Sequence, residues 1–322
     1  MTAPTWQLSP TRALTLDRPR LLAIINVTPD SFSDGGLYLD PRAAAQRAAQ
    51  AVSEGADALD LGAESTRPGA QPVPPDEQIR RVIPAIRAIR EAGIAAPITI
   101  DTTSAQVARA ALDSGADAIN DISAGRDDPE MFPLAAHRRC GLILMHRLRS
   151  PARDSFSTNY SSPPDYSPQG GCVAVVRTFL SQRTQAAIEQ NVPRGTIVLD
   201  PGLGFGKSVA DNFNLIRASG EFISLGFPLL GAASRKSFLT KWRAESPGTS
   251  SSPGTSSGTA DPSPAGAADP PESRAAASVA VSLIQYFAGV RLFRVHDVGE
   301  HAKALGIARV IAENPMNSGP ET

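Results

Sequence analysis

The sequence predicts an α/β fold in which eight parallel strands close into a (β/α)8 barrel. Eight short apolar runs alternate with helical patterns, which is typical of parallel strands joined by right-handed crossover helices. Most of the runs end on a polar residue, and the carboxyl ends of barrel strands open onto one common face. A chain of 322 residues with 41% hydrophobic residues suffices for one such domain, covering residues 1–322.

A doubly wound open sheet would produce the same alternation of strands and helices. In that fold the binding signals gather after one strand, near the point where the strand order reverses. Here polar residues follow nearly all of the apolar runs. This distribution favours the closed TIM barrel.

Composition narrows the class of protein. The formal net charge is −1 with both signs interspersed, and we expect neither a nucleic-acid nor a membrane partner. Cys140 and Cys172 form no CxxC pair, so we expect a reducing compartment and no structural zinc. Residues 1–20 contain no apolar signal segment, and no run approaches the roughly 18 apolar residues of a membrane span. We therefore expect a cytoplasmic protein.

The first element expected is an N-terminal β-hairpin within residues 1–20, which could close the floor of the barrel. The first barrel strand follows over Leu21 to Asn26. A helix is expected from Pro41 to Gly55, because proline suits the first helical turn and glycine suits the end.

The later elements follow the same plan. Strands are expected at the runs ALDLG, ITID, AIND, LILM, IVLD, LLGAA and LFRV. Helices are expected over residues 76–93, 105–115, 128–140, 172–190 and 276–289. Strands such as LLAII are apolar throughout, as expected when both faces are covered.

Two segments interrupt the alternation. Residues 147–171 are expected to form a long Ser/Pro/Tyr-rich loop after the fifth strand. Residues 244–278 contain no Leu, Ile, Val or Phe, which predicts a disordered Ser/Pro/Gly-rich insertion after the seventh strand. Its serines and threonines could be modification sites, but a tolerated loop insertion is the simpler interpretation. Residues 314–322 are expected to form a flexible tail.

Polar and basic side chains follow three of the strands and indicate a phosphate site. The set consists of Thr66, Arg67, Arg235, Lys236, Arg294 and His296. Guanidinium groups bind phosphate bidentately. A single such arginine would more often be a solvated loop charge, whereas this set at one barrel face predicts a phosphate site.

Acceptor side chains indicate a second, nitrogen-rich ligand group. Asp101, Asn120 and Asp200 end apolar strands, where an uncompensated charge is costly. Each could instead cap a helix, but residues 102–104 supply caps of their own after Asp101. Carboxylates beside an amide suit an N–C(NH2)–N edge, and Lys236 could bind a carbonyl of the same ring.

The histidines and the long loops differ in what they indicate. His137 and His301 lie in helical stretches and are expected at the surface, whereas His146 could be a satisfied core histidine. The loops 28–36 and 64–75 are longer than simple connectors and could be mobile lids. The glycine-rich run GLGFG lacks the full dinucleotide fingerprint and is a weak cofactor signal.

Five motifs, NVTPDSFSDGG, ESTRPGA, DPGLGFGK, SRKSF and RVHDV, resemble the dihydropteroate synthase family in order and spacing. The resemblance runs from about Leu21 to Gly299, apart from the two low-complexity loops. The family joins 6-hydroxymethyl-7,8-dihydropterin diphosphate to 4-aminobenzoate and releases diphosphate during folate synthesis. The resemblance implies these two small-molecule substrates, a Mg2+ cofactor and a homodimer formed through the last helices.

The resemblance also implies roles for individual residues. Pterin binding is implied for Asp101, Asn120, Met145, Asp200, Lys236 and Arg294. Diphosphate binding is implied for Asn26, Thr66, Arg67, Arg235, Arg294 and His296, with Asn26 as the Mg2+ ligand. The 4-aminobenzoate site is implied for Phe32, Pro68 and Phe205. Asp101, Lys236 and Arg235 are the expected catalytic residues.

Three alternatives share parts of this pattern. A pterin-dependent methyltransferase would have the acceptor pocket but no diphosphate to bind. A non-catalytic pterin-binding paralogue would be expected to lack Asn26, Arg235 or the lid motif, and all are present. A generic phosphate-binding barrel would not explain the acceptors. The chain departs from the family pattern at residues 231–233 and 147–149, which bears on the shape of the aminobenzoate entrance.

Overall fold

The structure is a computed structural model that describes residues 4–27, 40–241 and 271–313. Eight strands form one parallel sheet in the order β8-β7-β6-β5-β4-β3-β10-β9. These strands are β3 (Arg20–Asn26), β4 (Ala58–Gly62), β5 (Ile98–Asp101), β6 (Ala118–Asp121), β7 (Gly141–Met145), β8 (Ile197–Asp200), β9 (Leu230–Gly231) and β10 (Leu292–Val295). A parallel bridge between Leu199 and Leu229 joins the two ends of the sheet, and the predicted (β/α)8 barrel is confirmed.

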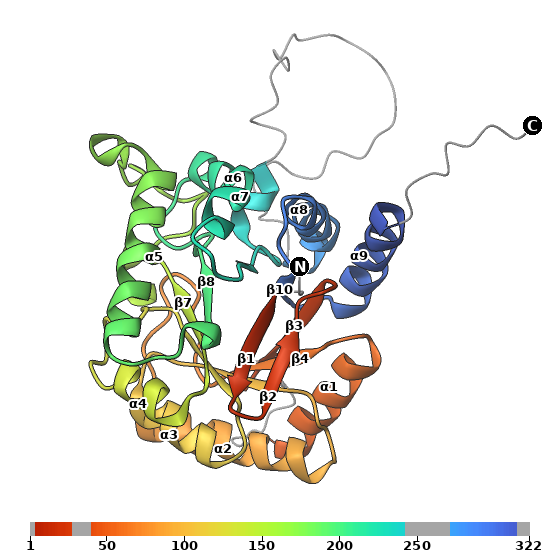
Figure 1. Cartoon of the computed structure of the whole chain (residues 1–322). Coiled ribbons are helices and arrows are strands. Elements are labelled where there is room, and N and C mark those ends of the chain that lie inside the picture. Colours follow the sequence, from red (N-terminus) through yellow and green to blue (C-terminus); the bar gives the residue numbers. More distant parts are fainter. Residues whose placement is uncertain (1–3, 28–39, 242–270, 314–322) are drawn as a thin grey trace, which may run out of the picture.

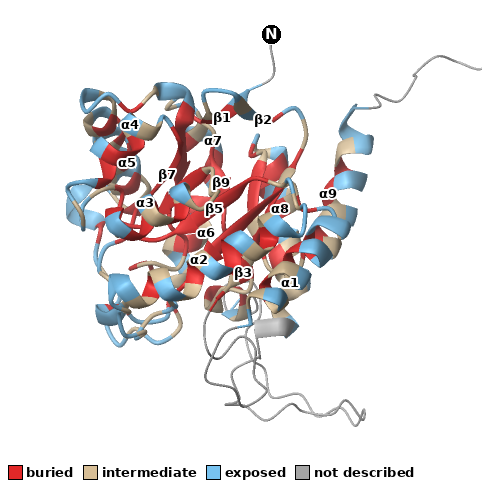
Figure 2. Cartoon of the chain, turned by 90° about the horizontal axis from the view of Figure 1, so that it is seen from below, coloured by how far each residue is buried: buried red, intermediate tan, exposed pale blue. Residues whose placement is uncertain are grey.

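Helices surround the sheet, and buried strands run through the centre of the molecule (Figures 1 and 2). The helices are α1 (Pro41–Ser53), α2 (Pro75–Glu91), α3 (Ala105–Asp113), α4 (Met131–Arg138), α5 (Cys172–Glu189), α6 (Val209–Arg217), α7 (Ser219–Ile223), α8 (Ala275–Phe287) and α9 (Val298–Glu313). Local sequence explains their starts: Asp40 caps α1 through the Arg42 amide, and Ser208 and Asp211 form a capping box on α6.

The strands are mostly apolar because each buries two faces. In β3, Leu21, Ala23 and Ile25 belong to the large cluster of buried residues that includes the helices. Leu22, which points the other way, belongs to a second cluster that also contains the first residues of several other strands. This second cluster fills the barrel interior at the amino ends of the strands.

The N-terminal hairpin closes that end of the barrel. It consists of β1 (Thr5–Ser9) and β2 (Arg12–Thr15), which pair antiparallel. Trp6 and Leu8 are fully buried in the interior cluster, and Trp6 Nε1 donates to the Thr196 carbonyl at 2.8 Å. Because the hairpin fills the floor, we expect a ligand to enter the barrel from the carboxyl ends of the strands.

The structure corrects two expectations. The end of the predicted 244–278 insertion is helical, since Pro271–Arg274 forms a 3-10 helix and α8 begins at Ala275. Alanine favours helix there, which the apolar content alone does not reveal. His301 is fully buried in α9, with Nδ1 at 2.8 Å from the Asp297 carbonyl, so its expected surface position is wrong.

Other expectations fall outside the described residues. These are the 28–36 lid, most of the 244–278 insertion and the 314–322 tail. Residues 147–171 are described and contain two short 3-10 helices, η2 (Pro151–Arg153) and η3 (Ser167–Gln169). Within the described ranges, none of the helices is both long enough and apolar enough to span a membrane.

Candidate active site

The strand ends predicted to carry chemistry meet at one face of the barrel. Asn26, Gly62, Asp101 and Asn120 are Cα partners in sequence across β3, β4, β5 and β6. Their side chains therefore share one layer of the barrel. Gly62 contributes no side chain to this layer, and a Cβ there would lie 3.6 Å from Asp101 Cβ.

Arg294 enters the barrel from β10 and binds two carboxylates. Its Nε donates to Asp60 Oδ2 at 2.5 Å, and its Nη2 donates to Asp101 Oδ2 at 2.7 Å. Burial opposes the charged form, but the Asp60 and Asp101 carboxylates outweigh it and raise the Arg294 pKa, so the guanidinium stays protonated. Arg294 and Asp101 were both predicted as site residues, and this contact brings them together.

Asp60 belongs to the same network and was not predicted. It is fully buried in β4, accepts from Asn120 Nδ2 at 3.2 Å, and is hydrogen-bonded by the Thr99 hydroxyl. The signal in the sequence is an aspartate inside the apolar run ALDLG, where a strand residue faces the barrel interior. Asp60 fixes the positions of both Arg294 and Asn120.

Asp101 has one carboxylate oxygen available to a ligand. Oδ2 is bound by Arg294, whereas Oδ1 is buried and has no hydrogen-bond partner among the described residues. Burial raises the Asp101 pKa to about 7, although Arg294 opposes this shift. An unpaired buried acceptor is costly, so this oxygen is suited to an N–H donor of a ligand.

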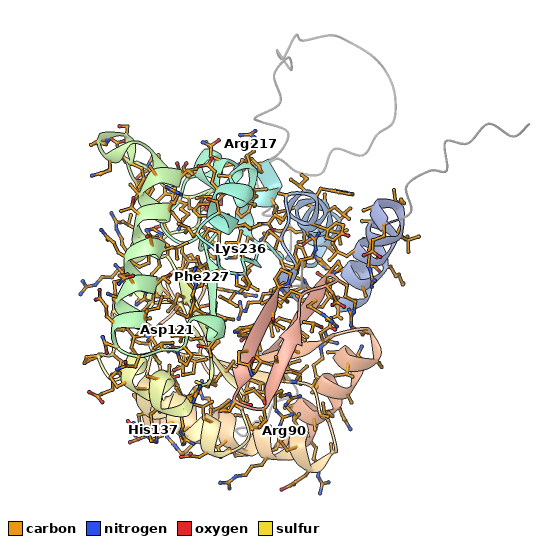
Figure 3. All side chains as sticks on the ribbon, in the orientation of Figure 1. Arg90, Asp121, His137, Arg217, Phe227 and Lys236 are labelled. Atoms are coloured by element: carbon orange, nitrogen blue, oxygen red, sulfur yellow. The ribbon has the colours of Figure 1, made fainter. Side chains whose placement is uncertain are left out.

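Asp200 and Lys236 face the site across the junction of β8 and β9. Asp200 Oδ1 accepts from the Gly202 amide at 2.6 Å, and burial raises the Asp200 pKa. Lys236 Nζ bonds the Leu203 carbonyl and lies 4.6 Å from the centre of the Phe205 ring. Burial lowers the Lys236 pKa to about 7, with Asp200 opposing the shift. Lys236 lies inside the ring of helices, while His137 and Arg217 lie at its periphery (Figure 3).

The turn after Asp200 requires glycine. Gly202 has φ +69°, and a Cβ there would lie 1.9 Å from the His146 carbonyl oxygen and 3.2 Å from Met145 Cγ. Met145 is buried and is the Cα partner of Asp200, which places it beside the acceptor set. The predicted pterin residues thus lie around one end of the barrel.

Charged groups crowd the opposite side of the same face. Arg235, with φ +57°, donates from Nε to Asp297 Oδ2 at 3.0 Å, and the bidentate pair orients its guanidinium. His296 Nδ1 lies 3.0 Å from Ser234 Oγ. Burial and the nearby Arg294, Arg235 and Arg67 lower the His296 pKa to about 3, so its imidazole is neutral at pH 7. Arg235 and Arg294 are paired with carboxylates, and the N–H donors that gather here with those of Arg67 and His296 are suited to an anion.

Thr66, Arg67 and Pro68 lie on the loop between β4 and α2. Arg67 is exposed, but its charge helps to lower the His296 pKa. Glu64 Oε2 accepts from the Val73 amide at 3.0 Å and anchors this loop, and burial raises the Glu64 pKa. The loop therefore extends the cationic side of the site.

Asn26 is expected to bind Mg2+, and Phe32 is expected to bind 4-aminobenzoate. Asn26 is half-buried at the end of β3 and is the Cα partner of Gly62. The described residues contain no group of three His, Cys, Asp or Glu side chains arranged for a metal. Phe32 lies outside the described residues.

His146 belongs to the core beside the site. Its ring packs edge-on against Phe179 with centroids 4.8 Å apart, and its Nδ1 lies 3.0 Å from Lys207 Nζ. Burial and the Lys207 charge lower the His146 pKa to about 2. The expectation of a core histidine agrees with this environment.

Comparison with known proteins agrees with this geometry. The family model for pterin binding enzymes matches residues 22–296. The chain is 39% identical over 289 residues to the dihydropteroate synthase of Mycobacterium leprae (strain TN), covering 89% of this chain and 92% of that protein.

Solved structures give the same result. The Xanthomonas albilineans dihydropteroate synthase with 4-aminobenzoic acid has a TM-score of 0.81 and 37% identity, covering 98% of this chain and 100% of that chain. The structure of the X. albilineans enzyme in complex with 7,8-dihydropteroate has a TM-score of 0.76 and 34% identity, covering 97% and 100%. This chain belongs to the pterin-binding enzyme family and, within it, to the dihydropteroate synthases.

Proposed function

We propose that the site joins 6-hydroxymethyl-7,8-dihydropterin diphosphate to 4-aminobenzoate by a dissociative substitution. The observation that carries the proposal is the division of one barrel face into an acceptor side and a cationic side. The unpaired Oδ1 of Asp101 marks the first side. The arginines that lower the His296 pKa mark the second.

The acceptor side binds the pterin. Asp101 Oδ1 and Asp200 accept from the N–H groups of the guanidine-like edge, and Asn120 donates to or accepts from the ring nitrogens. Lys236 donates to the ring carbonyl. Arg294 binds the other Asp101 oxygen and favours the ionised carboxylate, against the burial that raises the Asp101 pKa to about 7. Met145 forms an apolar wall.

The cationic side binds the diphosphate and stabilises its departure. Thr66, Arg67 and Arg235 donate to its oxygens, and the neutral His296 donates through one ring N–H. Arg294 adds its charge from β10. The bond between the exocyclic carbon and the diphosphate oxygen breaks, and its electron pair leaves with the diphosphate. The ring and the Asp101 carboxylate stabilise the cation that remains.

The Mg2+ proposal rests on Asn26. Magnesium prefers oxygen ligands, keeps several waters and commonly binds through one or two protein groups together with substrate phosphates. A single amide oxygen beside a diphosphate site fits this preference. When bound, the ion would add positive charge beside the departing diphosphate.

The arylamine completes the reaction. Pro68, Phe205 and Phe32 are proposed to hold 4-aminobenzoate with its amine facing the exocyclic carbon. The nitrogen lone pair forms the new C–N bond, and the amine then loses a proton to solvent or to diphosphate. Exclusion of water matters because water would otherwise capture the cation.

The test is diphosphate release coupled to dihydropteroate formation in a mixture of the purified protein, both substrates and Mg2+. We expect Asp101→Asn and Arg235→Ala to lower kcat/KM by about 100-fold, since each removes a group that acts on developing charge. Arg217→Ala, an exposed arginine on α6, is the matched control. Tight binding of the pterin without turnover would instead support the alternative of a non-catalytic pterin-binding paralogue.

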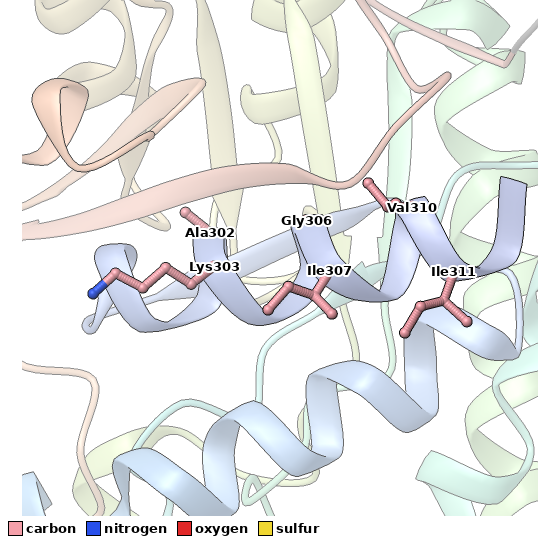
Figure 4. A pocket seen from close by; sticks show the side chains of 6 residues that line it. All are labelled: Ala302, Lys303, Gly306, Ile307, Val310 and Ile311. Carbon is pink, nitrogen blue, oxygen red and sulfur yellow. The ribbon is translucent and has the colours of Figure 1, made fainter. Parts of the chain in front are cut away.

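We further propose a homodimer formed through α8 and α9. Large apolar side chains are 55–68% exposed there: Ile284, Phe287, Ile307, Val310 and Ile311. Three of them line a shallow hollow along α9 (Figure 4). An exposed apolar patch of this kind is typical of an association surface.

Sedimentation velocity tests the dimer. We expect the wild type to sediment as a dimer and the Ile307→Glu, Ile311→Glu double variant as a monomer. Phe156→Glu, at a separate exposed position, should stay dimeric. A monomeric wild type would overturn the proposal.

We also propose a cytoplasmic location, which the free, buried thiols of Cys140 and Cys172 support.

A further inference from the structure

The long loop after β7 contacts two loops that carry proposed aminobenzoate residues, the loop of Pro68 and the loop of Phe205. We propose that its η2 turn, ending at Asp154, is a clamp that sets the spacing between those loops and thereby the fit of the arylamine. Asp154 is then a positioning residue. The inference rests on the proposed function and deepens it.

The first contact of the clamp is to the loop after β4. The Gly69 amide donates to the Pro151 carbonyl at 2.8 Å. The same carbonyl accepts from the Asp154 amide at 3.1 Å, which closes the 3-10 turn. Gly69 directly follows Pro68, so the position of Pro68 depends on this turn.

The second contact is to the loop after β8. Asp154 Oδ2 accepts from the Gly206 amide at 2.7 Å. Gly206 has φ +68°, and a Cβ there would lie 2.3 Å from Leu148 Cβ, so the two loops approach closely. Tyr166 also donates from its hydroxyl to the Gly206 carbonyl at 2.5 Å. Gly206 directly follows Phe205, so both peptide groups that flank this glycine are held by the loop after β7.

The clamp is rigid because the Asp154 carboxylate is buried and both of its oxygens accept hydrogen bonds. Its Oδ1 accepts from the Tyr160 hydroxyl at 2.5 Å and from the Ser155 amide at 2.9 Å. A buried carboxylate is costly unless it is hydrogen-bonded, and here neutral donors satisfy both oxygens. The Tyr160 contact also favours one orientation of the carboxylate.

The consequence is a fixed distance between the two sides of the aminobenzoate subsite. Pro151 and Asp154 belong to one closed turn, and each binds a glycine next to a proposed contact residue. The Phe205 ring in turn lies against Lys236 Nζ, on the pterin side of the site. The turn therefore aligns the arylamine with the pterin without touching either substrate.

Steady-state kinetics of Asp154→Ala and Asp154→Asn test the clamp. We expect Asp154→Ala to raise the KM for 4-aminobenzoate at least tenfold and to lower its preference over 3-aminobenzoate. The Kd for dihydropterin diphosphate, measured by calorimetry, should stay within twofold. Asp154→Asn keeps one acceptor oxygen and should fall between the wild type and Asp154→Ala.

The matched control is Asp165→Ala in the same loop. Asp165 is exposed and accepts from the Ser167 amide at 2.9 Å without touching either site loop. Asp165→Ala should leave the KM for 4-aminobenzoate and the Kd for dihydropterin diphosphate unchanged. An unchanged KM in Asp154→Ala, or a proportional loss for both substrates, would overturn the clamp. A wild type that does not turn over would instead contradict the proposed function.

Discussion

Asp60 and Arg294 form a buried ion pair, with Arg294 Nε donating to Asp60 Oδ2 at 2.5 Å in the interior of the barrel. The pair aims Arg294 Nη2 at Asp101 Oδ2, so Asp101 keeps its Oδ1 for a ligand. Asp60 thus shapes the site from the side away from the substrate.

Removal of the Asp60 carboxylate should affect stability and pterin affinity together. Asp60→Ala leaves Arg294 Nε and Asn120 Nδ2 without this acceptor, while Arg294 Nη2 keeps Asp101. The expected cost in unfolding free energy is roughly 1–3 kcal/mol for each unsatisfied donor. Asp60→Asn keeps the shape and one acceptor and should cost less, while weakening dihydropterin binding about tenfold. Urea unfolding and calorimetric titration measure the two effects. A fully stable Asp60→Ala protein would contradict the network.

Lys236→Met should stabilise the unliganded fold while abolishing turnover. The folded-state pKa of Lys236 is about 7, below the ordinary value of 10.5, so the unfolded chain binds more protons between these values. Wild-type stability should therefore rise with pH across this window, and the buried cation costs most below pH 7. Because the residue is half-buried, we expect a Tm gain of roughly 1–3 °C at pH 7.

Two comparisons make this result specific. The Tm gain of Lys236→Met should shrink as pH approaches 10.5, where both states of the wild type lose the proton. Lys241→Met, at an exposed position, should show no such dependence. A gain that is constant with pH would indicate packing rather than charge burial.

The Arg235–Asp297 pair should control binding of the diphosphate. Asp297→Asn removes the bidentate acceptor, while Arg235→Lys keeps the charge but loses the planar fork. We expect both to lower kcat/KM for the dihydropterin diphosphate by about 10- to 100-fold. The KM for 4-aminobenzoate should change little. Initial rates with each substrate varied in turn separate these effects, and equal changes in both KM values would count against the assignment.

Trp6 should matter for stability and not for catalysis. Trp6→Ala leaves a cavity in the barrel floor and is expected to cost roughly 3–5 kcal/mol. Trp6→Phe keeps most of the packing and loses the hydrogen bond to Thr196, so its cost should be smaller. Both variants should retain kcat/KM within about twofold below their Tm, because the floor lies at the end of the barrel away from the site.

The fold is largely predictable because parallel strands buried on both faces leave short, continuous apolar runs such as LLAII. Strand-end residues such as Asp101 and Asp200 were predictable for the same reason, since a charge that ends an apolar run is conspicuous. Asp60 was missed because it lies inside a run, and its interior direction depends on the register between β4 and β5. The surface position expected for His301 is wrong because its imidazole is buried and bonds the Asp297 carbonyl, just before α9, a partner that no local pattern indicates.

The clamp was not predictable from the sequence. Residues 147–171 have the composition of a tolerated loop, and nothing local identifies Asp154 as a buried acceptor. Its partner Gly206 is 52 residues further along the chain. Contacts between loops depend on how the barrel brings separate strand ends together, and no periodic pattern records them.

The junction between β8 and β9 is held by the single bridge at Leu199–Leu229 and by the Leu199 amide bonding the Pro228 carbonyl at 2.9 Å. This junction has the fewest backbone pairs of the described barrel, and it is where Asp200 ends β8 and Lys236 follows β9. Backbone amides of β9 should exchange with deuterium faster than those of β4, because fewer inter-strand hydrogen bonds must break to expose them. A pterin hydrogen-bonded to both side chains would connect the ends of β8 and β9, so substrate binding would stabilise the part of the barrel with the fewest backbone hydrogen bonds.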